Sequence, residues 1–189
     1  IDSFLCSLLT NKFSNHQNFL LKPGDFLQFE LNELERLSAS WKVVGNLPYN
    51  IATSIILHLL QDRSLFSKMV LMTQLEVAER MVARPNTRNY GRLSIIVQRK
   101  TQVRLRYQVE NTCFYPKPKV TSALVEIKPI FLERQGYLEN QMEMITQSAF
   151  GNRRKTIANS LRSFFSKNDI VACGLDPKSR AENLSIEDY

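Results

Sequence analysis

The sequence contains few of the residues that build disulfide frameworks or metal centres. It has 3 cysteines and 2 histidines in 189 residues, and Cys6, Cys113 and Cys173 lie far apart. An odd number of widely spaced cysteines fits neither a disulfide framework nor a zinc site. We therefore expect small buried side chains in a reducing compartment. His16 and His58 also lack the spacing of metal ligands, so we expect no metal.

Long hydrophobic runs are also missing. No stretch is apolar for long enough to cross a bilayer, and no signal peptide is visible, so we expect no membrane association. The hydrophobic fraction of 43% nevertheless supports a packed core. Because 25 Lys and Arg face 18 Asp and Glu, the formal net charge is +7, which favours nucleic acid as an anionic partner.

Strand and helix patterns alternate over the first 129 residues. Strands are expected within 18–31, 41–48, 68–74, 101–109 and 121–129, and helices within 1–9, 50–62, 75–83 and 92–100. This alternation predicts an α/β sheet with parallel strands. The last two strands follow each other through a proline-containing loop, which predicts a closing antiparallel hairpin.

The character of the sequence changes near Pro129. The segments 141–150, 152–165 and 169–175 have helical patterns and no strand pattern interrupts them. We therefore predict two domains, with a sheet-containing part at 1–129 and a small helical domain at 130–189.

The stretch GNLPY, residues 45–49, stands at the end of an expected buried strand. Ligands of open α/β sheets bind beyond the carboxyl ends of the strands. There Asn46 can offer a side-chain carbonyl and Leu47 a main-chain carbonyl, because Pro48 interrupts the strand ladder. Two converging acceptors suit an exocyclic amine with its two N–H donors, and Tyr49 offers a flat face for stacking. The pattern indicates a site for an amine-bearing base such as adenine.

Such a site could assist alkylation of the amine. Holding both hydrogens would aim the nitrogen lone pair at an electrophile, and much of this effect is orientation. No strong base is needed, because the nitrogen can lose its proton after attack. The alternative interpretation is structural: Asn46 caps the following helix and Tyr49 belongs to the core. The four residues alone leave both interpretations open.

Several segments resemble the ribosomal RNA adenine dimethyltransferases. GNLPYNIATSIILHLL (45–60) is similar to the adenine-N6 methylation motif of that family, and LEVAERMVARPNTRNYGRLSIIVQ (75–98) to a following segment. CFYPKPKVTSALVEIKP (113–129) matches its Phe-x-Pro-x-Pro loop and final strand. AFGNRRKTIANSL (149–161) and GLDPKSRAENLSIEDY (174–189) resemble the helical C-terminal region of the bacterial branch. The resemblance covers nearly the whole chain.

The resemblance implies a Rossmann-like methyltransferase sheet that uses S-adenosylmethionine, followed by a small all-helical C-terminal domain. It implies dimethylation of the N6 amines of two adjacent adenines near the 3′ end of small-subunit rRNA. The implied partner is the immature small ribosomal subunit, and the implied enzyme is a monomer. The implied location is the cytoplasm, or an organelle if the source is eukaryotic.

The resemblance also assigns roles to individual residues. It makes four residues catalytic and lets them hold the target adenine: Asn46, Leu47, Pro48 and Tyr49. Phe114 would pack against the other side of that base. Asp25 and Asn46 would bind the cofactor, with Asp25 accepting a hydrogen bond from the cofactor's adenine amine. An Asp after Pro-Gly is also a common turn residue, which is the alternative for Asp25.

The sequence departs from the family pattern at its start. A Gln-Asn-Phe-Leu segment, a Gly-rich loop and a ribose-binding Glu are absent from it. We therefore expect an N-terminally incomplete sequence that holds the cofactor poorly and is inactive by itself. Phe26, Leu75 and Thr121 also stand where a small residue, a Lys and an Asp are usual.

Arg153, Arg154 and Lys155 form a basic cluster, with Arg162 further along the same expected helix. Such a cluster is often a solvated helix start. Cations are unfavourable at a helix N-terminus unless an anion compensates, and RNA phosphates would do so. We therefore expect these four residues to bind RNA. The aromatic side chains of this region are expected to be core: Phe150, Phe164 and Phe165.

Two other functions remain open. One is a resistance-type methyltransferase of large-subunit rRNA, against which the segments RRKTIANSL and RAENLS speak. The other is a non-catalytic RNA-binding assembly factor, against which the presence of Asn46 and Tyr49 speaks.

Overall fold

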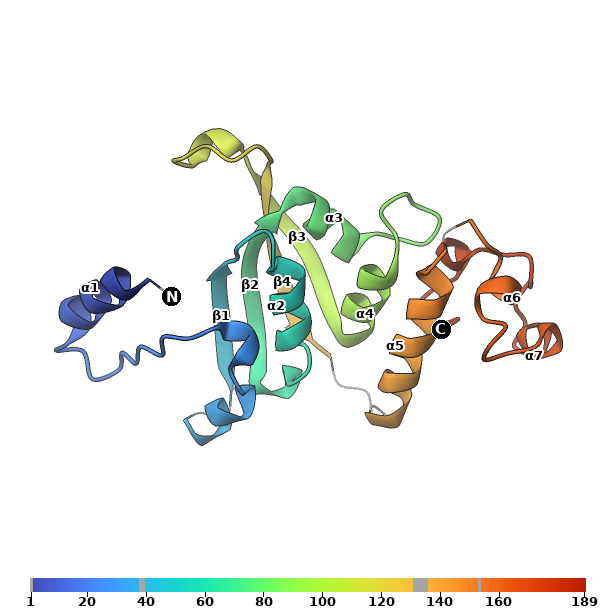
Figure 1. The fold of residues 1–189 in the computed structure, drawn as a ribbon, viewed down its shortest axis with the longest axis horizontal. Coiled ribbons are helices and arrows are strands. Elements are labelled where there is room, and N and C mark those ends of the chain that lie inside the picture. Colours follow the sequence, from blue (N-terminus) through green and yellow to red (C-terminus); the bar gives the residue numbers. More distant parts are fainter. Residues whose placement is uncertain (1, 38–39, 131–135, 153) are drawn as a thin grey trace.

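A four-stranded sheet lies at the centre of the computed structural model, which describes residues 2–37, 40–130, 136–152 and 154–189 (Figure 1). The strand order is β1-β2-β4-β3, with β1 parallel to β2 and with β4 antiparallel to both of its neighbours. The strands are β1 (Trp41–Asn46), β2 (Phe66–Gln74), β3 (Thr101–Val109) and β4 (Ser122–Pro129). The predicted α/β sheet and its closing antiparallel hairpin are confirmed.

Three helices cover one face of this sheet (Figure 1). They are α2 (Ala52–Leu59), α3 (Leu75–Val82) and α4 (Arg92–Lys100). The buried residues of α2 recur with helical spacing, which is why this apolar segment folds as a helix on the sheet. They pack into one core with the covered face of the strands: Ala52, Ile55, Ile56, Leu59, Met69, Leu71, Val125 and Ile127. A short 3-10 turn, η3 (Arg63–Leu65), leads into β2.

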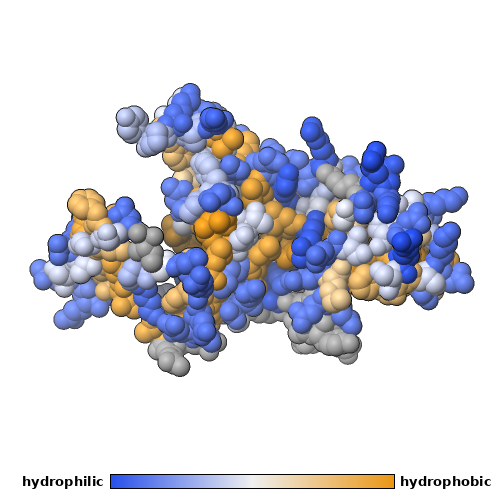
Figure 2. All heavy atoms as spheres, viewed as in Figure 1, coloured by the Kyte–Doolittle hydropathy of each residue, from blue (hydrophilic) through white to orange (hydrophobic). Residues whose placement is uncertain are grey.

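The first helix, α1 (Ser3–Phe13), lies apart from the sheet (Figure 1). Its N-cap Asp2 accepts a hydrogen bond from the Leu5 backbone N–H at 2.9 Å. None of its residues is buried, and Phe4 is 76% exposed. Figure 2 accordingly shows hydrophobic atoms at the surface over this helix.

The strand predicted within 18–31 is wrong. The segment instead contains the 3-10 turn η1 (Phe26–Gln28) and leads into η2 (Leu31–Arg36). The segment packs against α2: His58 Nε2 of α2 lies 2.9 Å from the backbone carbonyl oxygen of Phe29, and the Leu31 side chain is buried in the main core. Tertiary packing on a helix therefore replaces the strand pairing that its apolar alternation indicated.

The C-terminal region is helical, as expected. It contains α5 (Gly136–Phe150), α6 (Ile157–Ser160), α7 (Lys167–Ala172) and the 3-10 turn η5 (Ala181–Asn183). These elements share a hydrophobic cluster of their own, with buried residues Ala149, Ile157, Ala158, Leu161, Ile170, Ala181 and Leu184. Within the described ranges, no helix of the chain is long and apolar enough to cross a membrane.

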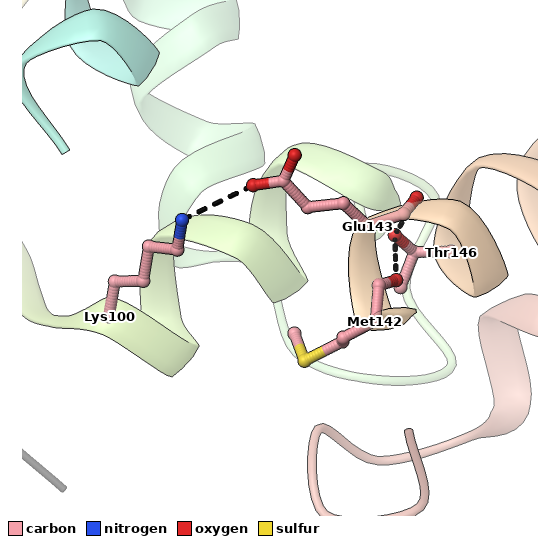
Figure 3. Close-up of polar contacts among 4 residues, drawn as sticks. All are labelled: Lys100, Met142, Glu143 and Thr146. Carbon is pink, nitrogen blue, oxygen red and sulfur yellow. Dashed lines mark hydrogen bonds and ion pairs between the residues drawn. The ribbon is translucent and has the colours of Figure 1, made fainter. Parts of the chain in front are cut away.

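The helical region is joined to the sheet region through the loop between α3 and α4. Tyr90 in this loop is 1% exposed, and its ring packs edge-on against Phe150 with centroids 6.3 Å apart. Asn86, with φ at 66°, donates its backbone N–H to the Glu182 carbonyl at 2.8 Å. Figure 3 shows a further link, in which Lys100 Nζ donates to Glu143 Oε1 at 3.2 Å.

The helix predicted over 152–165 is mostly wrong, because only α6 forms there. The backbone N–H groups of Ile157 and Ala158 donate to the carbonyls of Ser179 and Pro177, at 2.7 and 3.3 Å. Thr156 forms a bridge with Arg180. A continuous helix would need those donors for its own turns, so contact with the 177–180 segment confines the helix to one turn.

Candidate functional site

The turn after β1 is held at both ends by main-chain hydrogen bonds. The Leu47 N–H donates to the Met72 carbonyl at 3.0 Å, and the Ile51 N–H closes the turn onto the Pro48 carbonyl at 3.2 Å. Leu47 is buried over Gly45, where an added Cβ would lie 3.1 Å from Leu47 Cδ2. The absence of a side chain at Gly45 thus lets the turn pack tightly on the sheet.

Two hydrogen-bond acceptors of this turn are open. Asn46 is exposed, and its carboxamide forms no hydrogen bond with any described residue. Within the same described ranges, no backbone N–H donates to the Leu47 carbonyl. The N-cap of α2 is Ile51, so the alternative that Asn46 caps this helix is wrong. Neither acceptor has a donor among the described residues, and an amine with two N–H groups would supply one to each.

Tyr49 stands beside these acceptors and is half-buried. Its hydroxyl lies 2.5 Å from the Ser122 hydroxyl at the start of β4. Asn46 is in register with Met72 of β2, and Gln74 two residues further is in register with Ser122. The Asn46 side chain and the Tyr49 hydroxyl therefore lie at the same edge of the sheet. The alternative that Tyr49 is sealed in the core is wrong.

Phe114 belongs to the loop that joins β3 and β4. It follows the 3-10 turn η4 (Asn111–Cys113) and is partly exposed. The loop rises beyond the sheet in Figure 1, and its surface in Figure 2 is mostly hydrophilic. Because Val109 and Ser122 at its two ends are in register, the loop stands at the same edge as Tyr49. The structure thus brings Phe114 to the end of the sheet that carries Asn46, Leu47, Pro48 and Tyr49.

Asp25 caps η1 and is exposed. One carboxylate oxygen accepts from the Leu27 N–H at 3.0 Å, while the other has no partner among the described residues. The adjacent Phe26 ring packs edge-on against His58 of α2, 5.6 Å away. The turn role foreseen for Asp25 is therefore real, and it leaves one oxygen available to a ligand. No hydrogen bond or ion pair between described residues joins Asp25 to Asn46.

A buried carboxylate that sequence reasoning missed stabilises the sheet below the site. Glu126 of β4 forms ion pairs with Lys68 of β2 at 2.6 Å and with Arg106 of β3 at 2.7 Å. Hydrogen bonds from these two cations lower the pKa of Glu126 to about 2. A register shift between Leu105 and Tyr107 marks a bulge at Arg106. Lys68 and Arg106 are remote from Glu126 in sequence and approach it only because β4 lies between β2 and β3, which is why this cluster was not foreseen.

The predicted RNA-binding residues lie in the helical region, away from the turn after β1. Arg154 and Lys155 are exposed and line a hollow of about 580 Å³ with Gly151 and Asn152. Arg162 is exposed after α6, and Arg153 lies outside the described residues. Since α6 has only four residues, the expected placement at the start of a long helix is wrong, and the helix-dipole reasoning no longer applies.

The aromatic residues of this region divide into two groups. Phe150 packs against Tyr90 and Tyr189, so its core role is confirmed. Phe164 and Phe165 are 42% and 38% exposed, so their expected core role is wrong. A larger hollow of about 800 Å³, which the sequence did not indicate, lies between α3, the start of α4 and Phe150, and it contains Arg80, Arg88 and Arg92.

The sheet, with its Asn-Leu-Pro-Tyr turn at the carboxyl edge of parallel strands, defines an α/β protein of the Rossmann-like methyltransferase class. Two solved structures share this fold over the whole chain. A dimethyladenosine transferase from Plasmodium falciparum has a TM-score of 0.77 at 25% identity, and the 23S rRNA methyltransferase ErmE has 0.71 at 23% identity. The chain covers 76% of each.

Sequence comparison then gives the family. The model of the ribosomal RNA adenine dimethylase family matches residues 1–189, and the chain belongs to this family. It is 42% identical over 187 residues to ribosomal RNA small subunit methyltransferase A of Pseudomonas savastanoi pv. phaseolicola, covering 98% of the chain and 70% of that relative. The protein of the same name from Aromatoleum aromaticum is 39% identical over 190 residues, with 100% and 70% covered.

Proposed function

We propose that the protein transfers methyl groups to the N6 amines of two adjacent adenines near the 3′ end of small-subunit rRNA. The observation that carries this proposal is the open pair of acceptors at the turn after β1. The Asn46 carboxamide is exposed, and neither it nor the Leu47 carbonyl has a hydrogen-bond partner among the described residues. A purine amine with two N–H donors satisfies both.

The residues of the turn have distinct parts in the proposed reaction. Asn46 and Leu47 accept the two hydrogens of the amine and orient its lone pair. Pro48 has no backbone N–H with which to continue the strand ladder, which ends at Asn46, and no described backbone N–H donates to the Leu47 carbonyl. Tyr49 and Phe114 bound the flat faces of the base, and stacking of this kind contributes about 1–3 kcal/mol per base. The target base must leave any stack to reach them.

We propose S-adenosylmethionine as the methyl donor, which supplies an electrophilic methyl group on a sulfonium when bound. Asp25 fits such a ligand, since one of its carboxylate oxygens is exposed and has no described partner. That oxygen can accept from an adenine amine. Asn46 lies at the strand end where the amine of the substrate would face the donor. The proton of the alkylated nitrogen is released after attack, so none of these side chains needs to be a strong base.

The helical domain, which we place at 130–189, is proposed to hold the RNA. Its exposed cations Arg154, Lys155 and Arg162, together with Arg153, suit phosphate groups. Contacts of this kind position the RNA, whereas the pocket at the turn selects the base. The immature small ribosomal subunit would then be the partner, and the enzyme would act on it as a monomer in the cytoplasm or an organelle.

The proposal is tested with the complete gene product that contains these 189 residues. Small subunits that lack the two methylated adenines are incubated with labelled S-adenosylmethionine, and N6-dimethyladenosine is measured. We expect Asn46→Ala to lower turnover by about 100-fold or more, because it removes an orienting hydrogen bond, while affinity for the subunit changes by less than about twofold. Asn50→Ala is the matched control, since Asn50 is an exposed amide in the same turn.

Each other result has a defined meaning. Unchanged turnover in Asn46→Ala would contradict the role of the open acceptors. Label on large-subunit rRNA would indicate the resistance-type enzyme. Binding of the wild-type protein to small subunits without any label would indicate a non-catalytic assembly factor.

A further inference from the structure

Two hydroxyl groups connect the turn after β1 to the strand that follows the Phe114 loop. The Tyr49 and Ser122 hydroxyl oxygens are 2.5 Å apart, although the residues are 73 positions apart in sequence. Ser122 is fully buried, whereas Tyr49 is half-buried and reaches the edge of the sheet. Within the described ranges, each hydroxyl has only the other as a side-chain partner.

Ser122 is a fixed point of the structure. It is in register with Gln74 of β2 on one side and with Val109 of β3 on the other. The carbonyl of the preceding residue, Thr121, accepts from the Leu75 N–H at 2.9 Å. The Ser122 hydroxyl is therefore attached to a backbone that is held from both neighbouring strands and from the start of α3.

The Tyr49 ring is held at both of its ends as a result. Its Cβ end belongs to the turn that the Ile51 N–H closes, and its hydroxyl end is anchored on Ser122. Rotation about the side-chain torsions would break the hydroxyl contact. Rigid positioning of a group that orients a substrate can change turnover by orders of magnitude when it is lost.

The same contact joins the two sides of the candidate adenine site. The turn with Asn46 and Leu47 lies on one side, and the loop with Phe114 leads directly into Ser122 on the other. A displacement of either side would be transmitted to the other through this hydrogen bond.

We infer that Ser122 is a positioning residue for the target base: its hydroxyl fixes the Tyr49 ring in the orientation in which it stacks on adenine. This inference rests on the proposed function of Asn46 to Tyr49. Ser122 itself does not touch the substrate in this arrangement, because it is buried behind the tyrosine hydroxyl.

Three variants of the complete gene product test the inference: Ser122→Ala, Tyr49→Phe and the double variant. We expect each single variant to lower kcat by about 10- to 100-fold, with KM for S-adenosylmethionine and for small subunits within about twofold of wild type. Tyr49→Phe keeps the aromatic face, so its loss would come from the missing anchor. Since both substitutions remove one bond, the double variant should be within about twofold of the weaker single variant.

Thr73→Val is the matched control. Thr73 is fully buried one position from Gln74 in β2, and its hydroxyl has no hydrogen-bond partner. Thr73→Val therefore removes a buried hydroxyl group from the same edge of the sheet without breaking a hydrogen bond. We expect this variant to keep the wild-type kcat, and unfolding midpoints of all variants show that they are folded.

The outcomes separate this inference from the proposed function. If wild type is active and Asn46→Ala is not, but Ser122→Ala and Tyr49→Phe both equal wild type, the positioning role is overturned and the proposed function stands. Effects that multiply in the double variant, or an equal loss in Thr73→Val, would also overturn it. If wild type transfers no methyl group, the proposed function fails and this inference with it.

Discussion

The junction between the sheet and the helical region should depend on one aromatic side chain, that of Tyr90. The ring is 1% exposed in the loop between α3 and α4. It contacts a small hydrophobic cluster that contains Ala83, Ile95, Met142, Phe150 and Tyr189. Burial, followed by the nearby charges of Glu187 and Asp188, raises the pKa of Tyr90 to about 12, so the side chain stays neutral there.

We expect Tyr90→Ala to remove a large part of the stability of this chain. Truncation of a buried aromatic side chain to alanine typically costs about 3–5 kcal/mol, through lost burial and the cavity that remains. For a chain of this length, 1 kcal/mol shifts the unfolding midpoint by about 2–4 °C. The expected decrease in Tm is therefore about 6–20 °C. Limited proteolysis should also cut the variant faster near the loop at 84–91 than wild type.

Tyr107→Ala is the control for the loss of an aromatic ring as such. Tyr107 is 69% exposed on β3, and exposed substitutions usually change stability by about 0.5 kcal/mol or less. Thermal unfolding followed by circular dichroism measures both variants. A decrease in Tm of Tyr90→Ala no larger than that of Tyr107→Ala would refute the assigned role of the cluster.

Two further predictions concern charge. Glu126→Gln should destabilise the chain at neutral pH. The pKa of Glu126 is about 2 in the folded chain and 4.5 ordinarily, so its carboxylate stabilises the fold fully above pH 4.5 and loses this effect as the pH falls towards 2. The difference in stability between the variant and wild type should therefore disappear over that pH range. Equal stability of both proteins at pH 7 would contradict this. Replacing Arg154 and Lys155 by Ala should weaken binding to small subunits, and the slope of log K against log salt concentration should become shallower by about 1 per lost phosphate contact. Lys12→Ala, at an exposed lysine, should leave this slope unaltered. A wild-type slope in the variant that lacks both Arg154 and Lys155 would argue against phosphate contacts.

The strands and helices of the sheet region were largely predictable from local pattern. β3 and α4 have the bounds that alternation and helical spacing predicted. The residues of α2 that are buried are apolar residues that recur with helical spacing in its sequence. A helix pairs its backbone hydrogen-bonding groups within itself, and a strand of this kind follows one dominant periodicity of apolar residues. Neighbouring residues are therefore enough to predict these elements. The turn at residues 45–49 was also predictable. Pro48 has no backbone N–H, so the hydrogen bonds between this strand and its neighbour must end close to it, whatever the position of the strand in the sheet.

The predictions from sequence are wrong where a segment forms hydrogen bonds or packing contacts with another segment that is distant in sequence. The apolar segment before β1 packs on α2 and forms 3-10 turns, and the segment after α5 gives its N–H groups to residues 177–180. The exposure of Phe164 and the ion pairs of Glu126 depend in the same way on partners that are remote in sequence.

The candidate site shows the same division. Residue types and spacing determined that an amide, a carbonyl and a phenol ring follow one strand, and this suffices to indicate the chemistry of an amine-bearing base. Only the tertiary structure decided that the amide is open, that the phenol is anchored on Ser122 and that the Phe114 loop stands at the same edge. The physical reason is that hydrogen-bonding capacity is a property of each residue, whereas its satisfaction depends on which strands the fold places side by side.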